Sequence, residues 1–115
     1  MRVAINGFGR IGRSVFRILN SKKNVSVVAI NDIADNDAMV YLLKYDTVMG
    51  PFKDSVILDG DIMKTSKNQI KMVAEREPSL LPWKEIDVDV VIEATGIFRE
   101  KSQLQQHINA GAKRV

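Results

Sequence analysis

Residues 7–12, Gly-Phe-Gly-Arg-Ile-Gly, decide the fold of this chain and fit the pattern G-x-G-x-x-G. They follow directly on residues 2–6, a short apolar run with β-branched side chains that is typical of a buried strand. A helical pattern then opens, with apolar residues on one face at Ile11, Val15, Ile18 and Leu19. Strand, glycine-rich turn and helix in this order are the context that the pattern requires in dinucleotide-binding folds.

Each glycine of the turn has its own physical role. Gly7 allows the chain to leave the strand sharply, where a positive φ is expected. Gly9 has no side chain to keep a pyrophosphate from the backbone, and Gly12 lets the helix pack closely on the strand. We expect the backbone N–H groups of Arg10 and Ile11, at the positive end of the helix, to bind the phosphates.

An acidic residue follows the next apolar run. Residues 25–30 are predicted as a second strand, which leads into Asn31 and Asp32, about 20 residues after Gly12. A carboxylate there accepts hydrogen bonds from both ribose hydroxyls of an adenosine and repels a 2′-phosphate. Asp32 could instead only cap a loop after the strand. We favour the ribose assignment, and hence NAD, because all four features occur in order.

The middle of the chain is less regular and rich in strand signals. Residues 55–58 and 69–74 are predicted as strands, and Asp59-Gly60 is typical of a hairpin turn. We interpret this stretch as a small antiparallel excursion beside the main sheet.

The last third returns to the alternation of strand and helix. Residues 87–93 are predicted as a central parallel strand that runs into Thr95 and Gly96. Ligands bind at this edge of a doubly wound sheet, although Gly96 equally suits an ordinary turn. A helix over residues 101–109 and the start of a further strand at residues 113–115 follow. We expect an α/β fold, a Rossmann-type doubly wound parallel sheet with a small antiparallel excursion, truncated before the domain is complete.

Few residues in this sequence could serve in a catalytic or metal centre. The single histidine, His107, is expected to face away from the sheet, and we expect no catalytic role because no partner nucleophile is at hand. The chain contains no cysteine, so neither thiol chemistry nor a cysteine-ligated metal is available within it. We therefore expect no catalytic residue and no metal site.

Charge and hydropathy indicate the classes of partner. Seventeen Lys and Arg against fourteen Asp and Glu leave +3, too small an excess to indicate a nucleic-acid or membrane surface. Arg10, Arg13 and Arg17 line one side of the first helix, which we interpret as a solvated or interface-facing stripe. An RNA-binding face is the alternative, and it predicts a strongly salt-dependent affinity. No run approaches the roughly 20 apolar residues of a membrane span, and we expect a cytoplasmic protein.

Longer stretches of the chain resemble glyceraldehyde-3-phosphate dehydrogenase. They are residues 4–13, 29–32, 43–47, 74–76, 93–98 and 110–113, in the family's order and with its spacing. The resemblance implies that Arg10 and Ile11 bind the NAD pyrophosphate, and that Asp32 binds the adenosine ribose. It also implies that Arg76 contacts the adenine side and that Thr95 and Gly96 contact the cofactor, with Phe98 as a weaker candidate. Met49 stands where family members often carry histidine.

The resemblance also implies an activity for the parent protein. The family's nucleophile is a cysteine in a Ser-Cys-Thr-Thr-Asn stretch, activated by a distant histidine, and neither matches a position here. Residues 1–115 would then be the NAD-binding domain, incomplete at its C-terminal end, with the catalytic domain outside the chain. The implied protein is a homotetramer of glycolysis that oxidises a phosphorylated aldehyde to an acyl phosphate, with inorganic phosphate and NAD.

Two alternatives to this activity stay open at the level of sequence. Erythrose-4-phosphate dehydrogenase is similar in the same motifs, and a dinucleotide fingerprint does not distinguish two aldehydes. A stand-alone, non-enzymatic dinucleotide-binding module is the alternative of another class, and it would apply if the natural chain ended at Val115.

Overall fold

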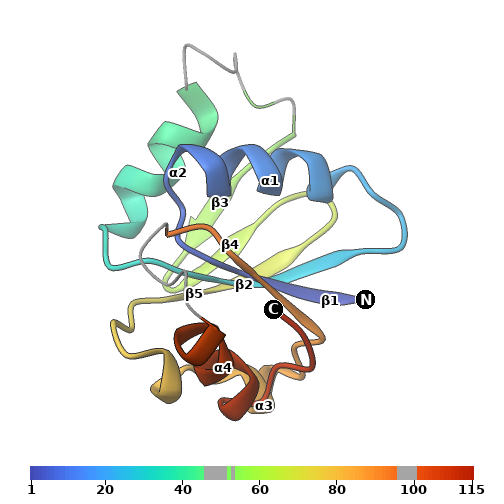
Figure 1. The fold of residues 1–115 in the computed structure, drawn as a ribbon. Coiled ribbons are helices and arrows are strands. Elements are labelled where there is room, and N and C mark those ends of the chain that lie inside the picture. Colours follow the sequence, from blue (N-terminus) through green and yellow to red (C-terminus); the bar gives the residue numbers. More distant parts are fainter. Residues whose placement is uncertain (46–51, 53, 96–100) are drawn as a thin grey trace.

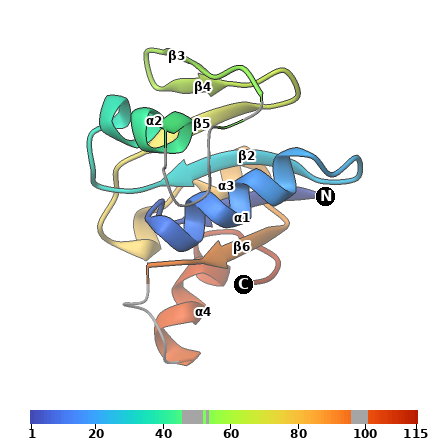
Figure 2. The same ribbon diagram turned by 90° about the horizontal axis from the view of Figure 1, so that it is seen from above.

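A computed structural model describes residues 1–45, 52, 54–95 and 101–115, and its centre is a six-stranded sheet (Figures 1 and 2). In chain order the elements are β1 (Arg2–Asn6), α1 (Arg10–Asn20), β2 (Ser26–Asn31), α2 (Asn36–Tyr45), β3 (Ile57–Asp59), β4 (Ile62–Lys64), β5 (Gln69–Val73), the 3₁₀ helix η1 (Pro78–Leu80), α3 (Trp83–Ile86), β6 (Val90–Glu93) and α4 (Lys101–Asn109).

The sheet has the strand order β3-β4-β5-β2-β1-β6. β1 pairs in parallel with both β2 and β6, and β2 pairs in parallel with β5. β3 and β4 form an antiparallel hairpin, and β4 pairs antiparallel with β5. The predicted α/β fold with a parallel sheet and an antiparallel part is confirmed. The antiparallel part lies within the main sheet rather than beside it, because β5 belongs to both pairings.

The last described strand, β6, has partners on both of its sides. β6 neighbours β1 alone among the described strands, and its other side carries only an isolated parallel bridge between Val90 and Arg114. That bridge lies in residues 113–115, where the sequence predicts a further strand. The predicted parallel strand is confirmed over Val90–Glu93, and its second side is partnered by this bridge.

Helices cover both faces of the sheet, as a doubly wound fold requires. Figure 1 shows α1 and α2 on one face and α3 and α4 on the other. The α1–α2 side buries a cluster that includes Phe8, Phe16, Ile30, Leu43 and Ile70. The opposite side buries a smaller cluster that includes Trp83, Val88, Val91 and Ala112. The strands are thus shielded from water on both sides, which is why β1 and β2 are apolar along nearly their whole length.

The inward face of α1 includes only two of its four predicted apolar residues, Val15 and Leu19, which pack against the core. Ile11 and Ile18 are 68% and 56% exposed, whereas Gly12 and Phe16 are buried. Phe16 packs edge-on against Phe8, with ring centroids 5.8 Å apart. The close approach of Gly12 to the turn fixes which side of the helix faces the sheet. This contact has more effect on the orientation of α1 than the number of aliphatic side chains on one of its faces.

Two of the three arginines on α1 are held against the protein. Arg13 is only 9% exposed, and its guanidinium donates to the backbone oxygen of Phe8 over 3.1 Å. Arg17 donates to the backbone oxygen of Leu43 over 2.6 Å and lies over the ring of Phe52. Arg13 and Arg17 therefore do not form a solvated stripe with Arg10 but link α1 to its neighbours.

None of the helices in the described ranges is both long and apolar enough to cross a lipid bilayer.

Candidate functional site

The glycine-rich turn is shaped by two close contacts. Gly7 has φ +96°, as predicted, and a Cβ there would lie 2.8 Å from the backbone nitrogen of Thr95. A Cβ on Gly12 would overlap the backbone oxygen of Gly7. Any side chain at either position would push β1, α1 and the end of β6 apart, so the turn is fixed by packing on both sides.

Gly9 differs from these two glycines because it faces open space. A Cβ built at Gly9 meets no described atom within 4 Å. Gly9 is also the N-cap of α1, and the helix begins at Arg10. The first N–H groups of a helix lack intrahelical acceptors and carry partial positive charge. The first turn of α1, which lies wholly within the described residues, holds no acidic side chain to neutralise that charge.

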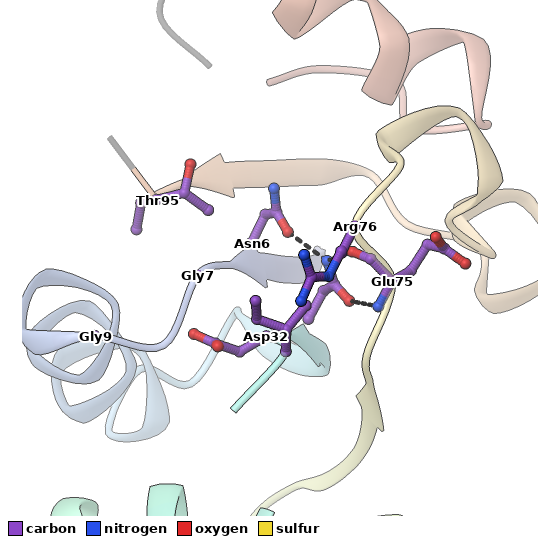
Figure 3. A pocket seen from close by; sticks show the side chains of 10 residues that line it. Asn6, Gly7, Gly9, Asp32, Glu75, Arg76 and Thr95 are labelled. Carbon is purple, nitrogen blue, oxygen red and sulfur yellow. Dashed lines mark hydrogen bonds between the residues drawn. The ribbon is translucent and has the colours of Figure 1, made fainter. Parts of the chain in front are cut away.

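A cavity of about 500 Å³ opens beside Gly9, at the carboxyl ends of the parallel strands. Its described lining comes from the ends of β1, β2, β5 and β6 and the segments that follow them: Asn6, Gly7, Gly9, Asn31, Asp32, Ile33, Glu75, Arg76, Ala94 and Thr95 (Figure 3). This edge is where ligands bind in doubly wound sheets. The volume lies within the range of roughly 300–1,000 Å³ that is usual for cofactor and ligand sites.

The cavity gathers most of the residues that the sequence singles out. Gly7, Gly9, Asp32, Arg76 and Thr95 line it, although they come from segments far apart in the chain. In the view of Figure 3, Asn6 lies between Thr95 and Arg76.

Other predicted residues lie beside the cavity or outside the described ranges. Arg10 and Ile11 are exposed and are not among the described lining of the cavity. Gly12 lies behind the turn, against Gly7. Gly96, Phe98 and Met49 fall outside the described residues.

Asp32 ties the end of β2 to the glycine-rich turn. Its Oδ2 accepts a hydrogen bond from the backbone N–H of Phe8 over 2.7 Å, and its Oδ1 accepts one from Ala34 over 2.9 Å. The carboxylate therefore caps the loop after β2, as the simpler sequence interpretation supposed. It also lines the cavity, and two oxygens with about four lone-pair sites leave acceptor capacity for a ligand.

Two buried asparagines form part of the floor of the cavity, and the sequence analysis did not identify them. Asn6 and Asn31 face each other across the β1–β2 pair and are 2% and 5% exposed. The side-chain N–H of Asn31 donates to Asn6 Oδ1 over 2.7 Å. Asn31 Oδ1 accepts from the backbone N–H of Glu75 over 2.8 Å. The signal in the sequence was a polar amide at the end of each of two apolar strands.

Glu93, at the end of β6, holds Thr95 at the rim. Glu93 Oε2 accepts from the Thr95 hydroxyl over 2.7 Å and from its backbone N–H over 3.1 Å. Glu93 Oε1 accepts from Asn6 Nδ2 over 2.7 Å. Burial raises the pKa of Glu93, but the hydrogen bonds from His107, Thr95 and Asn6 outweigh it and hold this pKa below its ordinary value.

His107 contradicts its predicted position. It is fully buried and faces the sheet, with Nε2 2.8 Å from Glu93 Oε1 and Nδ1 3.0 Å from the indole nitrogen of Trp83. Leu104 and Ile108 are the apolar residues on either side of it in α4. Both are only partly buried, because the buried carboxylate of Glu93 brings the imidazole inward instead.

Comparison with known proteins assigns the chain to a family. The family described as "Glyceraldehyde 3-phosphate dehydrogenase, NAD binding domain" matches residues 1–101. This chain belongs to that family. The family's NAD-binding domain agrees with the predicted cofactor and with the Rossmann-type fold.

Relatives of this NAD-binding family cover the chain from end to end. A glyceraldehyde-3-phosphate dehydrogenase of Mycoplasma pneumoniae is 46% identical over 115 residues, which are 100% of this chain and 34% of the relative. One of Thermotoga maritima is 49% identical, over 99% of this chain and 35% of the relative. A cytosolic one of Trypanosoma brucei brucei is 46% identical, over 100% of this chain and 35% of the relative. The chain thus spans about a third of the length of these relatives.

The residues of the cavity fit a dinucleotide of the kind that the family binds. A side chain at Gly9 would enter open space at the cavity rather than the protein core, so the cradle depends on its absence. The helix N-terminus beside it suits phosphate. Within residues 1–45, 52, 54–95 and 101–115, no three His, Asp or Glu side chains come together as a metal site would need.

Proposed function

We propose that this protein binds NAD in the cavity at the carboxyl ends of β1, β2, β5 and β6, as the cofactor-binding part of a phosphorylating glyceraldehyde-3-phosphate dehydrogenase. The observation that carries the proposal is the convergence of Gly9, Asp32, Arg76 and Thr95 on one cavity. A turn glycine and a loop-capping acid have no structural need to share a cavity with an exposed arginine from a distant segment. A dinucleotide requires this arrangement, because its phosphates and ribose must be held together.

The phosphates and the adenosine ribose are bound by the first two βα units. The N–H groups of Arg10 and Ile11 donate to the pyrophosphate at the open N-terminus of α1, where Gly9 leaves room. Asp32 accepts hydrogen bonds from the ribose hydroxyls with the lone pairs that Phe8 and Ala34 leave unused. Its negative charge disfavours a 2′-phosphate, which makes the site selective for NAD over NADP.

The remaining contacts come from the ends of β5 and β6. Arg76 binds on the adenine side, and Thr95 and Gly96 contact the cofactor after β6. The family resemblance supports all three assignments, and the lining of the cavity supports those of Arg76 and Thr95.

The proposal extends to the whole protein. NAD supplies the hydride acceptor, and the residues of this chain bind and orient it. A catalytic domain outside residues 1–115 carries the cysteine nucleophile and its histidine, and binds the phosphorylated aldehyde and inorganic phosphate. The share of the relatives that this chain spans supports such a domain. We further propose that the protein is cytoplasmic, in keeping with a relative named cytosolic, and that it is a homotetramer, as the family resemblance implies.

The Asp32→Gly variant tests the proposed ribose contact. We expect the dissociation constant of NAD to rise about tenfold, because hydrogen bonds to a charged group are lost, while NADP binding changes less. Calorimetric titration of the intact protein with each dinucleotide measures both. Asp61→Gly, the same change at an exposed carboxylate on the hairpin, is the control. An unchanged NAD affinity in Asp32→Gly would overturn the ribose assignment.

A further inference from the structure

A buried hydrogen-bond chain runs from α3 and α4 to the cavity. It starts at the indole N–H of Trp83, which can only donate and which lies 3.0 Å from His107 Nδ1. Nδ1 must therefore be the unprotonated acceptor nitrogen of the ring. The proton lies on Nε2, which donates to Glu93 Oε1 over 2.8 Å. The two neighbours fix His107 as the neutral tautomer with its proton on Nε2.

Glu93 connects this chain of hydrogen bonds to two residues of the cavity. Besides His107, its carboxylate accepts from Asn6 Nδ2 and from the hydroxyl and backbone N–H of Thr95. Asn6 and Thr95 both line the cavity, whereas neither Glu93 nor His107 is among its described lining (Figure 3). The Glu93 carboxylate thus lies behind the lining of the cavity and accepts hydrogen bonds from two lining residues, Asn6 and Thr95.

The same chain continues to the opposite side of the cavity. Because Asn6 Nδ2 is directed to Glu93, Asn6 Oδ1 is left to accept from Asn31, and Asn31 Oδ1 accepts from the backbone N–H of Glu75. Glu75 directly precedes Arg76 in the chain. The hydrogen bonds of Asn6 and Asn31 thus connect Glu93 to the segment that carries Arg76.

We infer that His107 and Glu93 are positioning residues, which hold Thr95 and Asn6 in the arrangement that receives the cofactor. This inference rests on the proposed function of the cavity. Stability alone does not account for a carboxylate at this place, since removing a charge from water costs free energy that an apolar side chain would not cost. Its hydrogen bonds are instead directed to residues of the cavity.

A double-mutant cycle on NAD affinity tests the role of Glu93. Glu93→Gln keeps the shape of the side chain but offers an amide N–H₂ in place of one acceptor oxygen. We expect the dissociation constant of NAD to rise about tenfold. If Glu93 acts through Thr95, the same substitution has a clearly smaller effect in a Thr95→Val background. Equal effects in the two backgrounds, or none in either, would overturn the inference.

The control for this cycle is Glu85→Gln, at an exposed carboxylate on α3. NAD affinity should match wild type in this variant. Thermal unfolding of every variant, followed alongside, separates lost positioning from lost folding. A tenfold loss of affinity that Glu85→Gln shares would also contradict the inference.

His107 offers a test through its donor atom. His107→Gln keeps an N–H donor near the position of Nε2, whereas His107→Leu removes it. We expect His107→Gln to retain more NAD affinity than His107→Leu. Equal losses in the two variants would mean that packing, rather than the hydrogen bond to Glu93, matters at this site.

The tautomer itself can be measured in the protein with its native side chain. In the intact protein labelled with ¹⁵N-histidine, the His107 ring should show a protonated Nε2 and an unprotonated Nδ1 near neutral pH. The resonances are assigned by their loss in His107→Gln. A ring protonated on both nitrogens, or on Nδ1 alone, would contradict the hydrogen-bond chain.

Failure of the inference and failure of the proposed function are distinguishable. If wild type binds NAD and Gly9→Val does not, the cavity is the NAD site, and the Glu93 and His107 variants then test positioning alone. If Gly9→Val binds NAD as tightly as wild type, the proposed site itself is wrong, and the positioning inference falls with it.

Discussion

Two regions of the sheet contain paired polar side chains, and the two pairs differ in their exposure to water. At the carboxyl ends of the parallel strands, Glu93 and His107 form a pair with side chains 8% and 0% exposed. At the β3–β4 hairpin and the adjoining β5, Lys71 pairs with Asp61 over 2.7 Å, and these side chains are 48% and 56% exposed. Both regions contain a short contact to a carboxylate, but only the first removes its groups from water.

The difference in exposure indicates in which region the protein depends on exact hydrogen-bond geometry. A buried charge needs a hydrogen bond at nearly every polar atom, because water cannot replace a missing partner. An exposed pair loses little when it separates, because water and salt screen it. We therefore expect function to depend on the first region, and we expect the hairpin to tolerate change.

The largest effect is expected from removing the buried carboxylate. Glu93→Ala leaves the donors of Asn6, Thr95 and His107 without their shared acceptor. We expect the free energy of unfolding to fall by about 3 kcal/mol, because buried donors are left without an acceptor. Chemical denaturation measures it. A loss below about 1 kcal/mol, the range of exposed pairs, would remove the distinction between the two regions.

A second contrast lies within the glycine-rich turn. Gly12→Ala places a Cβ against the backbone oxygen of Gly7, and we expect it to cost about 2 kcal/mol of folding free energy. Gly9→Ala places its Cβ in open space and should stay within about 0.5 kcal/mol of wild type. Thermal or chemical unfolding of the two variants compares them. Equal stabilities would mean that the turn is not closely packed on β1.

The stability of the protein at acidic pH should also depend on the buried carboxylate of Glu93. Because the folded-state pKa of Glu93 lies below its ordinary value of 4.5, its ionised form stabilises the fold above that pH. This contribution is lost as the pH falls from 4.5 through the lower folded-state pKa. We expect Glu93→Gln to lose less stability than wild type over that window. Parallel acid dependences of the two proteins would contradict the assignment.

The smallest effect is expected at the hairpin. Lys71→Met removes the partner of Asp61, whose pKa is lowered by its hydrogen bond and charge interaction with Lys71. Because both groups are exposed, the melting temperature should be indistinguishable from that of wild type at physiological salt. Differential scanning calorimetry at low and high salt measures it. A large, salt-independent loss would show that the hairpin pair is structurally essential.

The glycine-rich turn and the parallel-sheet fold could be predicted from the sequence because their signals are local. Gly7, Gly9 and Asp32 lie at fixed distances along one βαβ unit, and Thr95 follows a recognisable strand. Arg76 carried no local signal and came only from the family resemblance. Its place at the cavity depends on the pairing of β5 with β2, which no pattern within β5 specifies.

The inward faces of α1 and α4 could not be predicted because they depend on distant partners. Counting apolar residues selected Ile11 and Ile18, whereas the backbone contact at Gly12 and the ring of Phe8 orient α1. His107 is drawn inward by Glu93, a partner that adjoins it only after β6 and α4 have packed together.

The most direct test of the central claim is NAD binding by Gly9→Val. The substitution adds a side chain where the structure leaves open space, so the protein should fold with the stability of wild type. Calorimetric titration of the intact protein, with folding checked by thermal unfolding, should show NAD binding in wild type and none in Gly9→Val. A folded Gly9→Val protein that binds NAD as tightly as wild type would contradict the claim that this cavity is the cofactor site.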